Sequence, residues 1–237
     1  MRKKLDVTST NIQGFDDLVD GGFVKNSIIT LTGGVATGKS TFGVQFLYNG
    51  VIKDNENGML ISFEEKKKTI YRNMLKLGMN LKQLEDEQKL IVINYPPHEV
   101  DLFFEQEETL VNLIDKFGIS RLVIDTASSL GSFFDTKEKR REGMLKLIDK
   151  LRNWKCTTIL INENYENPDI SKSMESLCDG VIYFYNPLMK GIRKRGVEVY
   201  EMRGSKHSMS VHPMRITSKG IEAVSYTHLT LPTKRIV

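Results

Sequence analysis

The chain has 237 residues, 40% of them hydrophobic and 27% charged, a composition that suits a single globular α/β domain. Its 34 basic and 30 acidic residues give a net charge of +4, which is too small to indicate nucleic-acid binding by itself. No apolar run approaches the roughly 18 residues of a membrane span, and no apolar run follows the charged N-terminus as it would in a signal peptide. The two cysteines, Cys156 and Cys178, lie near predicted buried strands, so we expect reduced thiols and a cytoplasmic protein.

The first predicted elements are a short helix, a strand and a glycine-rich loop. Residues 14–18 predict a helix that ends in the glycine turn at 21–22. Residues 27–32 are apolar or β-branched, as in a buried strand, and residues 41–48 carry apolar side chains at helical spacing. Residues 33–40 lie between them and read Gly-Gly-Val-Ala-Thr-Gly-Lys-Ser, which fits the pattern G-x-x-x-x-G-K-[ST] at every fixed position.

A phosphate-binding P-loop explains these residue types. Glycines let the backbone curl so that its N–H groups point at phosphate oxygens, at the positive end of a helix. Lys39 is then placed to reach the β- and γ-phosphates, and the Ser40 hydroxyl is placed to bind Mg²⁺. The alternative is a glycine turn that binds nothing, and the flanking strand and helix argue against it. The residues predicted to bind ATP are Gly33, Gly34, Val35, Ala36, Thr37, Gly38, Lys39, Ser40 and Thr41.

The rest of the chain alternates predicted strands and helices. Further strands are predicted at 59–63, 90–94, 121–125, 157–162 and 180–185, and helices at 66–77, at 100–117 and from 135–142 onward. This alternation predicts an α/β fold with a mostly parallel sheet flanked by helices, and the P-loop motif indicates that this fold is that of a P-loop NTPase. Three short strands without intervening helices, at 195–202, 214–217 and 221–224, predict a small C-terminal β meander.

One domain is predicted over residues 1–224. Residues 225–237 continue none of these patterns, and we interpret them as a cloning or sequence-assembly scar. The competing interpretation is a natural flexible tail.

Carboxylates follow two of the predicted strands. Asp125 ends the strand at 121–125, where a Walker-B aspartate would hold the Mg²⁺ water shell together with Ser40. The alternative is an aspartate that caps the next helix. Glu64 and Glu65 end the strand at 59–63, at the carboxyl edge of the sheet where open α/β folds bind ligands. We favour Glu65 as the general base with Glu64 in support, against the alternative of two surface glutamates that open a helix.

Several segments together resemble one protein family. They are residues 14–22, 33–41, 61–65, 122–126, 158–163, 178–182 and 202–207. The P-loop is shared by many families, whereas the Phe-Glu-Glu strand end and the Met-Arg-Gly-Ser-x-His segment are much more specific. On these segments, which cover residues 14 to about 222, the chain resembles a single-domain KaiC-like ATPase of the RecA superfamily.

The resemblance implies ATP hydrolysis between the subunits of a ring, usually a hexamer. It implies that Glu64 and Glu65 are the catalytic carboxylates. It also implies that Arg203 reaches the phosphates of the neighbouring subunit as an arginine finger, with Met202 and His207 near that interface. A cation that arrives only on assembly would couple ring formation to hydrolysis, because its charge stabilises the transition state. A surface arginine at a strand end is the alternative for Arg203.

The chain departs from the family pattern at three places. Glu201 stands where the family usually has lysine, which puts contacts to the neighbour's nucleotide in doubt, although Lys206 could partly substitute. Ser176 follows a glutamate where the clock protein of the group has a Ser-Thr phosphoacceptor pair, so clock-type autokinase activity is not expected. Val35 and Ala36 replace a common Pro-Gly pair in the P-loop.

The favoured function is a ring-forming regulatory or signalling ATPase, with a protein partner that reads its nucleotide state. One alternative is a nucleotide-sensing scaffold with little turnover, of the archaeal motility accessory type. Another is a DNA-dependent ATPase of the RecA/RadA type. For that class the basic cluster Lys190, Arg193, Lys194 and Arg195 could contact nucleic acid, but the absence of interleaved aromatic residues favours a solvated turn.

Overall fold

A nine-stranded sheet forms the centre of the computed structural model, which describes residues 5–96, 99–132, 134–163 and 174–224. The strands of this sheet are β3 (Ile28–Gly33), β4 (Asn57–Ser62), β5 (Leu90–Asn94), β6 (Ile119–Asp125), β7 (Thr157–Glu163), β8 (Gly180–Tyr185), β11 (Gly196–Met202), β12 (Val211–Thr217) and β13 (Gly220–Ala223). Two short antiparallel pairs lie outside it, β1 (Val7–Thr8) with β2 (Phe23–Val24) and β9 (Leu188–Met189) with β10 (Ile192–Arg193).

The order of strands across the sheet is β13-β12-β11-β8-β3-β7-β6-β4-β5. The six strands from β8 to β5 run parallel, and β11, β12 and β13 join them antiparallel. The predicted mostly parallel sheet and the predicted C-terminal meander are therefore confirmed. The tail predicted at 225–237 lies outside the described residues.

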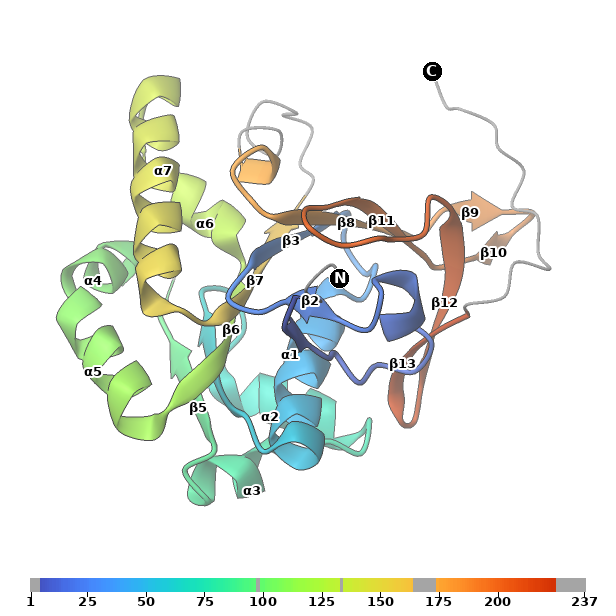
Figure 1. Ribbon diagram of the computed structural model, residues 1–237, viewed down its shortest axis with the longest axis horizontal. Coiled ribbons are helices and arrows are strands. Elements are labelled where there is room, and N and C mark those ends of the chain that lie inside the picture. The colour runs from blue at the N-terminus through green and yellow to red at the C-terminus, as the bar shows by residue number, and fades with distance from the viewer. Residues whose placement is uncertain (1–4, 97–98, 133, 164–173, 225–237) are drawn as a thin grey trace.

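Helices cover both faces of the sheet (Figure 1). They are η1 (Asp16–Leu18), α1 (Lys39–Asn49), η2 (Gly50–Asp54), α2 (Lys67–Leu75), α3 (Leu81–Asp86), α4 (Val100–Glu105), α5 (Glu107–Phe117), α6 (Ala127–Ser132) and α7 (Lys137–Trp154). One hydrophobic core packs under α1, α2 and α3, and a second packs under the helices from α4 to α7. No helix in the described part of the chain is long and apolar enough to span a bilayer.

The single helix predicted over 100–117 is wrong. Gln106 separates α4 from α5, with a backbone conformation (φ −91°, ψ 21°) outside the helical range. Its side-chain oxygen accepts a hydrogen bond from the Tyr95 hydroxyl at 2.9 Å, so the break is fixed by a contact to the end of β5. Helical periodicity continues across such a break, because both helices bury apolar faces in the same core.

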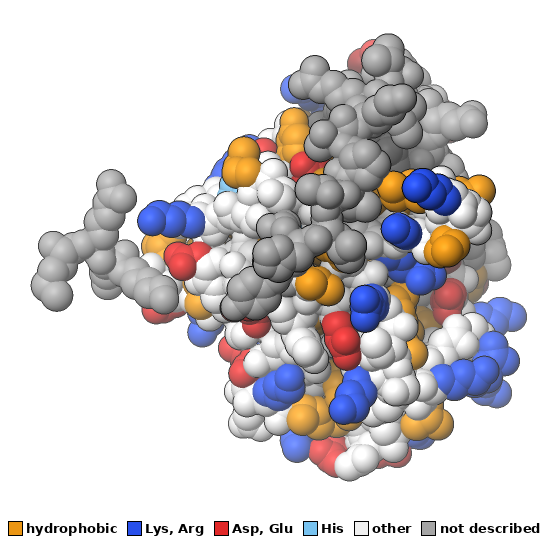
Figure 2. All heavy atoms as spheres, turned by 90° about the vertical axis from the view of Figure 1, so that its right-hand side faces the viewer, with side chains coloured by type: hydrophobic (Ala, Val, Ile, Leu, Met, Phe, Trp, Pro, Cys, Tyr) orange, Lys and Arg blue, Asp and Glu red, His pale blue; other side chains and the backbone are white. Residues whose placement is uncertain are grey.

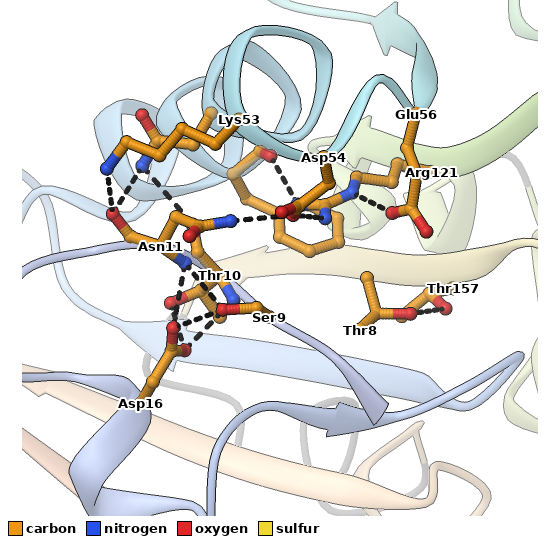
Figure 3. A network of polar contacts seen from close by, with 12 residues as sticks. Thr8, Ser9, Thr10, Asn11, Asp16, Lys53, Asp54, Glu56, Arg121 and Thr157 are labelled. Atoms are coloured by element: carbon orange, nitrogen blue, oxygen red, sulfur yellow. Dashed lines mark hydrogen bonds and ion pairs between the residues drawn. The ribbon is translucent and has the colours of Figure 1, made fainter. Parts of the chain in front are cut away.

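The N-terminal segment is tied to the far end of the P-loop helix by polar contacts (Figure 3). The Asp16 carboxylate accepts hydrogen bonds from the backbone N–H groups of Thr10 and Asn11, both at 2.9 Å. The side chain of Asn49, near the end of α1, donates to the Asn11 carbonyl at 2.9 Å, and Lys53 donates to the same oxygen at 3.1 Å. Residues that precede the sheet in the sequence thus fix the carboxyl end of α1.

Arg121 continues this network into the core. Its side chain is fully buried, and its guanidinium pairs with Glu56 at 2.7 Å and with Asp54. It also donates to the Phe46 carbonyl at 3.0 Å and stacks over the Phe46 ring at 4.7 Å. A side chain at Gly50 would collide with it, because an added Cβ would lie 2.4 Å from its Nε. One β6 side chain therefore holds together α1, η2 and β6.

Replacement of Arg121 by methionine should destabilise the protein strongly. Asp54 and Glu56 would lose their shared cation, and the Phe46 carbonyl would lose a donor inside the core. We expect a loss of about 3 kcal/mol in the free energy of unfolding, measured by urea titration. Lys146→Met is the matched control, since it breaks an exposed pair with Glu142 and should leave the free energy of unfolding nearly unchanged.

Candidate functional site

The P-loop leaves the sheet at the carboxyl end of β3 and leads into α1. Gly33 admits no side chain, since an added Cβ would lie 2.4 Å from the Phe184 carbonyl oxygen on β8. Gly38 adopts φ 105°, in the left-handed region that favours glycine. Lys39 is 5% exposed, and its Nζ donates to the carbonyls of Gly33 at 2.7 Å and Gly34 at 2.8 Å. The loop thus folds around its own lysine.

Three carboxylates surround this lysine. Burial lowers the pKa of Lys39, and the charges of Glu163, Asp125 and Glu64 act in the opposite direction. Asp125 and Glu64 were predicted site residues. Glu163, at the end of β7 and paired in register with Gly33, was assigned no role from the sequence. Its position after a buried strand at the same sheet edge is the signal that could have identified it.

Asp125 and Ser40 are brought together as predicted. Asp125 is 7% exposed, and burial raises its pKa to about 6. A hydrogen bond from Ser40 acts against this shift, whereas the charges of Glu64 and Glu65 add to it. A hydroxyl and a buried carboxylate are the oxygen ligands that Mg²⁺ prefers. A cation beside Asp125 would also stabilise the ionised form that burial disfavours, so the residues present fit the metal.

Asp125 should therefore reduce the stability of the nucleotide-free protein at neutral pH. Because its folded pKa lies above the unfolded value of 3.8, stability falls as pH rises from about 4 to about 6 and stays lower above that range. Asp125→Asn should raise the free energy of unfolding at pH 7 by up to about 3 kcal/mol and leave it nearly unchanged at pH 4. Urea titrations at the two pH values test this. A variant that is destabilised equally at both would contradict it.

The two adjacent glutamates differ in their surroundings. Glu64 accepts a hydrogen bond from the Thr126 hydroxyl at 3.0 Å, which anchors its carboxylate beside the strand end. Glu65 instead lines a cavity together with Ser40 and Asp125. The structure therefore separates two residues that the sequence alone could not rank firmly. The sequence predicted no role for Thr126, the positioning partner of Glu64.

The turn that presents Glu65 is held from behind. The Ser62 hydroxyl and the Asn94 side chain both donate to the Glu65 backbone carbonyl at 3.0 Å. The N–H of Phe63 donates to the Asp125 carbonyl at 2.7 Å, which links the ends of β4 and β6. Neither Ser62 nor Asn94 was predicted to support the site, because their partners lie on a turn whose path the sequence does not reveal.

The cavity has a volume of about 310 Å³ and extends from the P-loop helix to α2. One end is polar, where Ser40, Glu65 and Asp125 meet. The other end lies between α1 and α2 and is mainly apolar. Besides Ser40, Glu65 and Asp125, the residues that line the cavity are Thr41, Val44, Ile70, Asn73, Met74, Lys76 and Leu77. The cavity thus offers an oxygen-rich end for phosphates and metal and an apolar end beside it, as a nucleotide requires.

Comparison with known proteins identifies the family. The family described as "ATPase: KaiC" matches residues 8–227 of this chain. The chain belongs to the KaiC family of ATPases. It is 31% identical to the circadian clock oscillator protein KaiC of Synechococcus elongatus over 222 residues, which is 90% of this chain and 43% of that protein. The chain therefore spans less than half the length of the clock proteins that it matches.

Two archaeal proteins match over most of their own length. A UPF0273 protein of Methanocaldococcus jannaschii is 30% identical over 90% of this chain and 93% of its own length. A crystal structure of a KaiC-like protein from Pyrococcus horikoshii superposes with a TM-score of 0.84 at 31% identity and covers 93% of this chain and 99% of its own. The predicted KaiC-like, RecA-like fold is confirmed.

Arg203 lies near the amino ends of the parallel strands of this KaiC-family chain, whereas the P-loop lies at their carboxyl ends. It follows Met202, which pairs with Gly180 at the start of β8, and its N–H donates to the Asp179 carbonyl at 2.8 Å. Gly180 pairs in turn with Ile29 near the start of β3, whereas the P-loop begins at the other end of that strand. Ile29 and Gly33 are four positions apart on β3, which corresponds to roughly 13 Å along the strand. Arg203 therefore does not reach the phosphate site of its own subunit.

The guanidinium of Arg203 is engaged locally. Its Nε donates to Glu201 at 3.0 Å and its Nη2 to the Ser176 carbonyl at 3.4 Å. The side chains of Arg203 and Glu201 are 49% and 42% exposed. Glu201, which stands where the family usually has lysine, is thus the counter-ion of Arg203, the predicted arginine finger.

The predicted basic cluster surrounds the β9–β10 hairpin and the strand that leaves it. Arg193 donates to the Asn186 carbonyl at 2.9 Å, and Arg195 donates to the Ala36 carbonyl at 3.2 Å, so two of the four cations serve local contacts. On this face, Lys and Arg side chains are spread among acidic and hydrophobic ones (Figure 2). The arrangement favours the predicted solvated turn over a nucleic-acid surface.

Proposed function

We propose that the chain binds ATP with Mg²⁺ and hydrolyses it at sites completed by a neighbouring subunit in a ring. The observation that carries the proposal is the convergence of Ser40, Asp125 and Glu65 on one cavity at the end of the P-loop, with the buried Lys39 under the charge of Asp125. These are the parts that phosphoryl transfer to water requires: a phosphate cradle, metal ligands and a carboxylate to orient the water.

Each residue has one role in this proposal. Lys39 would leave the carbonyls of its own loop for the β- and γ-phosphates, and its charge would oppose the negative charge that develops in the transition state. Ser40 and Asp125 would hold Mg²⁺, partly through water, and the metal would neutralise phosphate charge. Glu65 would take a proton from the attacking water, while Glu64, anchored by Thr126, supports it.

The position of Arg203 supports a site shared between subunits. The exposed Arg203 lies near the amino ends of the parallel strands, and the phosphate site lies at their carboxyl ends. Two such surfaces on neighbouring subunits would form a head-to-tail contact. Such contacts close into rings when the rotation between subunits allows it. Ring formation is also a property of the KaiC family. We therefore propose that Arg203 acts in trans and that the ring is hexameric.

A scaffold with little turnover is the second candidate, and the Glu201–Arg203 pair favours it. A finger that is held by its own counter-ion would be less available to a neighbour. In that case ATP would drive assembly without rapid hydrolysis. Either way we propose a cytoplasmic regulatory role, read by a protein partner that recognises the nucleotide state.

ATP hydrolysis measured against protein concentration, together with mass by light scattering, tests the proposal. With ATP and Mg²⁺ we expect a ring, and turnover per subunit should rise as the ring forms. Lys39→Ala should abolish both, because its buried ammonium is the cation of the phosphate cradle. Assembly with turnover at background would support the scaffold instead. If the wild type neither binds ATP nor assembles, both candidates are refuted.

A further inference from the structure

The P-loop carries an alanine in an unfavourable backbone conformation. Ala36 has φ 60°, in the left-handed region, and its side chain is exposed, so no packing contact holds it there. For a residue with a Cβ this region is disfavoured by roughly ten-fold or more, whereas glycine adopts it freely. Something other than the residue's own preference must therefore fix the loop in this shape.

Two donors from outside the loop converge on the carbonyl of this alanine. The Asn186 side chain donates to the Ala36 oxygen through Nδ2 at 3.2 Å, and Arg195 donates to the same oxygen through Nε, also at 3.2 Å. Both side chains are half-buried. A carbonyl oxygen has two lone pairs, so this pair of donors satisfies it fully.

The fold brings the two donors together at the base of the β9–β10 hairpin. Tyr185 and Gly196 are a cross-strand pair of β8 and β11, and Asn186 and Arg195 are the first residues beyond this end of the two strands. β8 is also the strand beside the P-loop, since Phe184 pairs with Gly33. The hairpin base is thus built next to the loop, although about 150 residues separate them in the sequence.

We propose that Asn186 and Arg195 are positioning residues that clamp Ala36 and hold the P-loop in its nucleotide-binding shape. The inference rests on the proposed binding of ATP at this loop and adds two residues to it. It also accounts for the replacement of glycine by Ala36: the two hydrogen bonds supply the conformation that glycine would adopt by itself. Glycine at position 36 should therefore make the clamp dispensable.

A simple electrostatic role for the hairpin is the competing explanation. Arg195 carries a charge near the phosphate site, and its loss could weaken ATP binding without any effect on loop shape. Asn186 is neutral, so Asn186→Ala removes a donor without a change in charge. Lys194→Ala is the matched control, since it removes one exposed charge from the residue next to Arg195. Among the described residues, the Lys194 side chain makes no contact to the loop.

The test is a double-mutant cycle on ATP affinity, read by equilibrium titration of the full chain. Asn186→Ala should weaken ATP binding by about five-fold and Arg195→Ala by about ten-fold or more, as expected for the loss of one neutral and one charge-assisted hydrogen bond. In an Ala36→Gly background the loss from Asn186→Ala should shrink to less than about two-fold, because glycine needs no clamp. Lys194→Ala should bind as the wild type does.

The cycle separates this inference from the proposed function. If the wild type binds ATP and Asn186→Ala binds it with the same affinity, the clamp is refuted, whereas the proposed ATP binding stands. An Asn186→Ala loss that is just as large with glycine at position 36 also refutes the clamp, because the residue would then act on the ligand or on the general fold. No ATP binding by the wild type would refute nucleotide binding at this loop and the clamp with it.

Discussion

Glu65→Gln should lower the rate of ATP hydrolysis by about 10³-fold and leave ATP affinity nearly unchanged. Glu65 lines the cavity beside Ser40 and Asp125, on a turn that Ser62 and Asn94 fix from behind. Glutamine keeps the size of the side chain and its hydrogen-bonding reach but does not accept the proton of the attacking water. The loss should therefore appear in kcat, measured under saturating ATP, while the dissociation constant of ATP stays the same.

Glu64→Gln is the matched control, because it makes the same chemical change one residue earlier. Its carboxylate accepts the Thr126 hydroxyl, and a glutamine oxygen would accept the same bond, so we expect a loss nearer ten-fold. Equal losses in the two variants would mean that the glutamates act as one unit and that the distinction drawn from the cavity is wrong. A larger loss for Glu64 than for Glu65 would reverse the two roles.

The order of elements and the core of the site follow from local sequence signals. The P-loop is one continuous stretch, and its flanking strand and helix are visible in hydrophobic spacing. Asp125 and Glu65 each end a buried strand, and parallel strands place their carboxyl ends at one edge of the sheet. The sequence therefore predicts that Asp125 and Glu65 lie close together, and the structure places both on one cavity.

The contacts that refine the site depend on register and on turns, which local sequence does not encode. Asn186 meets Ala36 only because β8 lies beside β3 with Phe184 opposite Gly33. Thr126 reaches Glu64 only because β4 and β6 are neighbours in the sheet. The break between α4 and α5 was missed for the same reason, since its cause is a side chain from another element. Patterns predict which residues face the core, but not which polar groups meet across it.

Arg203→Ala should lower turnover in the assembled protein by about 10³-fold, the magnitude expected for an arginine finger. Register separates this arginine from its own P-loop by roughly 13 Å along the strands, so under the proposed function the charge it supplies would act on another subunit. ATP binding and ring mass should remain as in the wild type. Arg215→Ala, which removes an exposed arginine from β12, is the control and should leave turnover unchanged.

A mixing experiment distinguishes action in trans from a structural effect. Subunits with Glu65→Gln retain Arg203, and subunits with Arg203→Ala retain Glu65, so each variant alone should be nearly inactive. In mixed rings, an Arg203→Ala site that receives the arginine of a Glu65→Gln neighbour is complete. Random mixing of equal amounts should therefore restore roughly a quarter of the wild-type turnover, because a head-to-tail ring gives each site one donor neighbour. If mixed rings form and remain inactive, Arg203 acts within its own subunit or only maintains the fold, and the shared site must be abandoned.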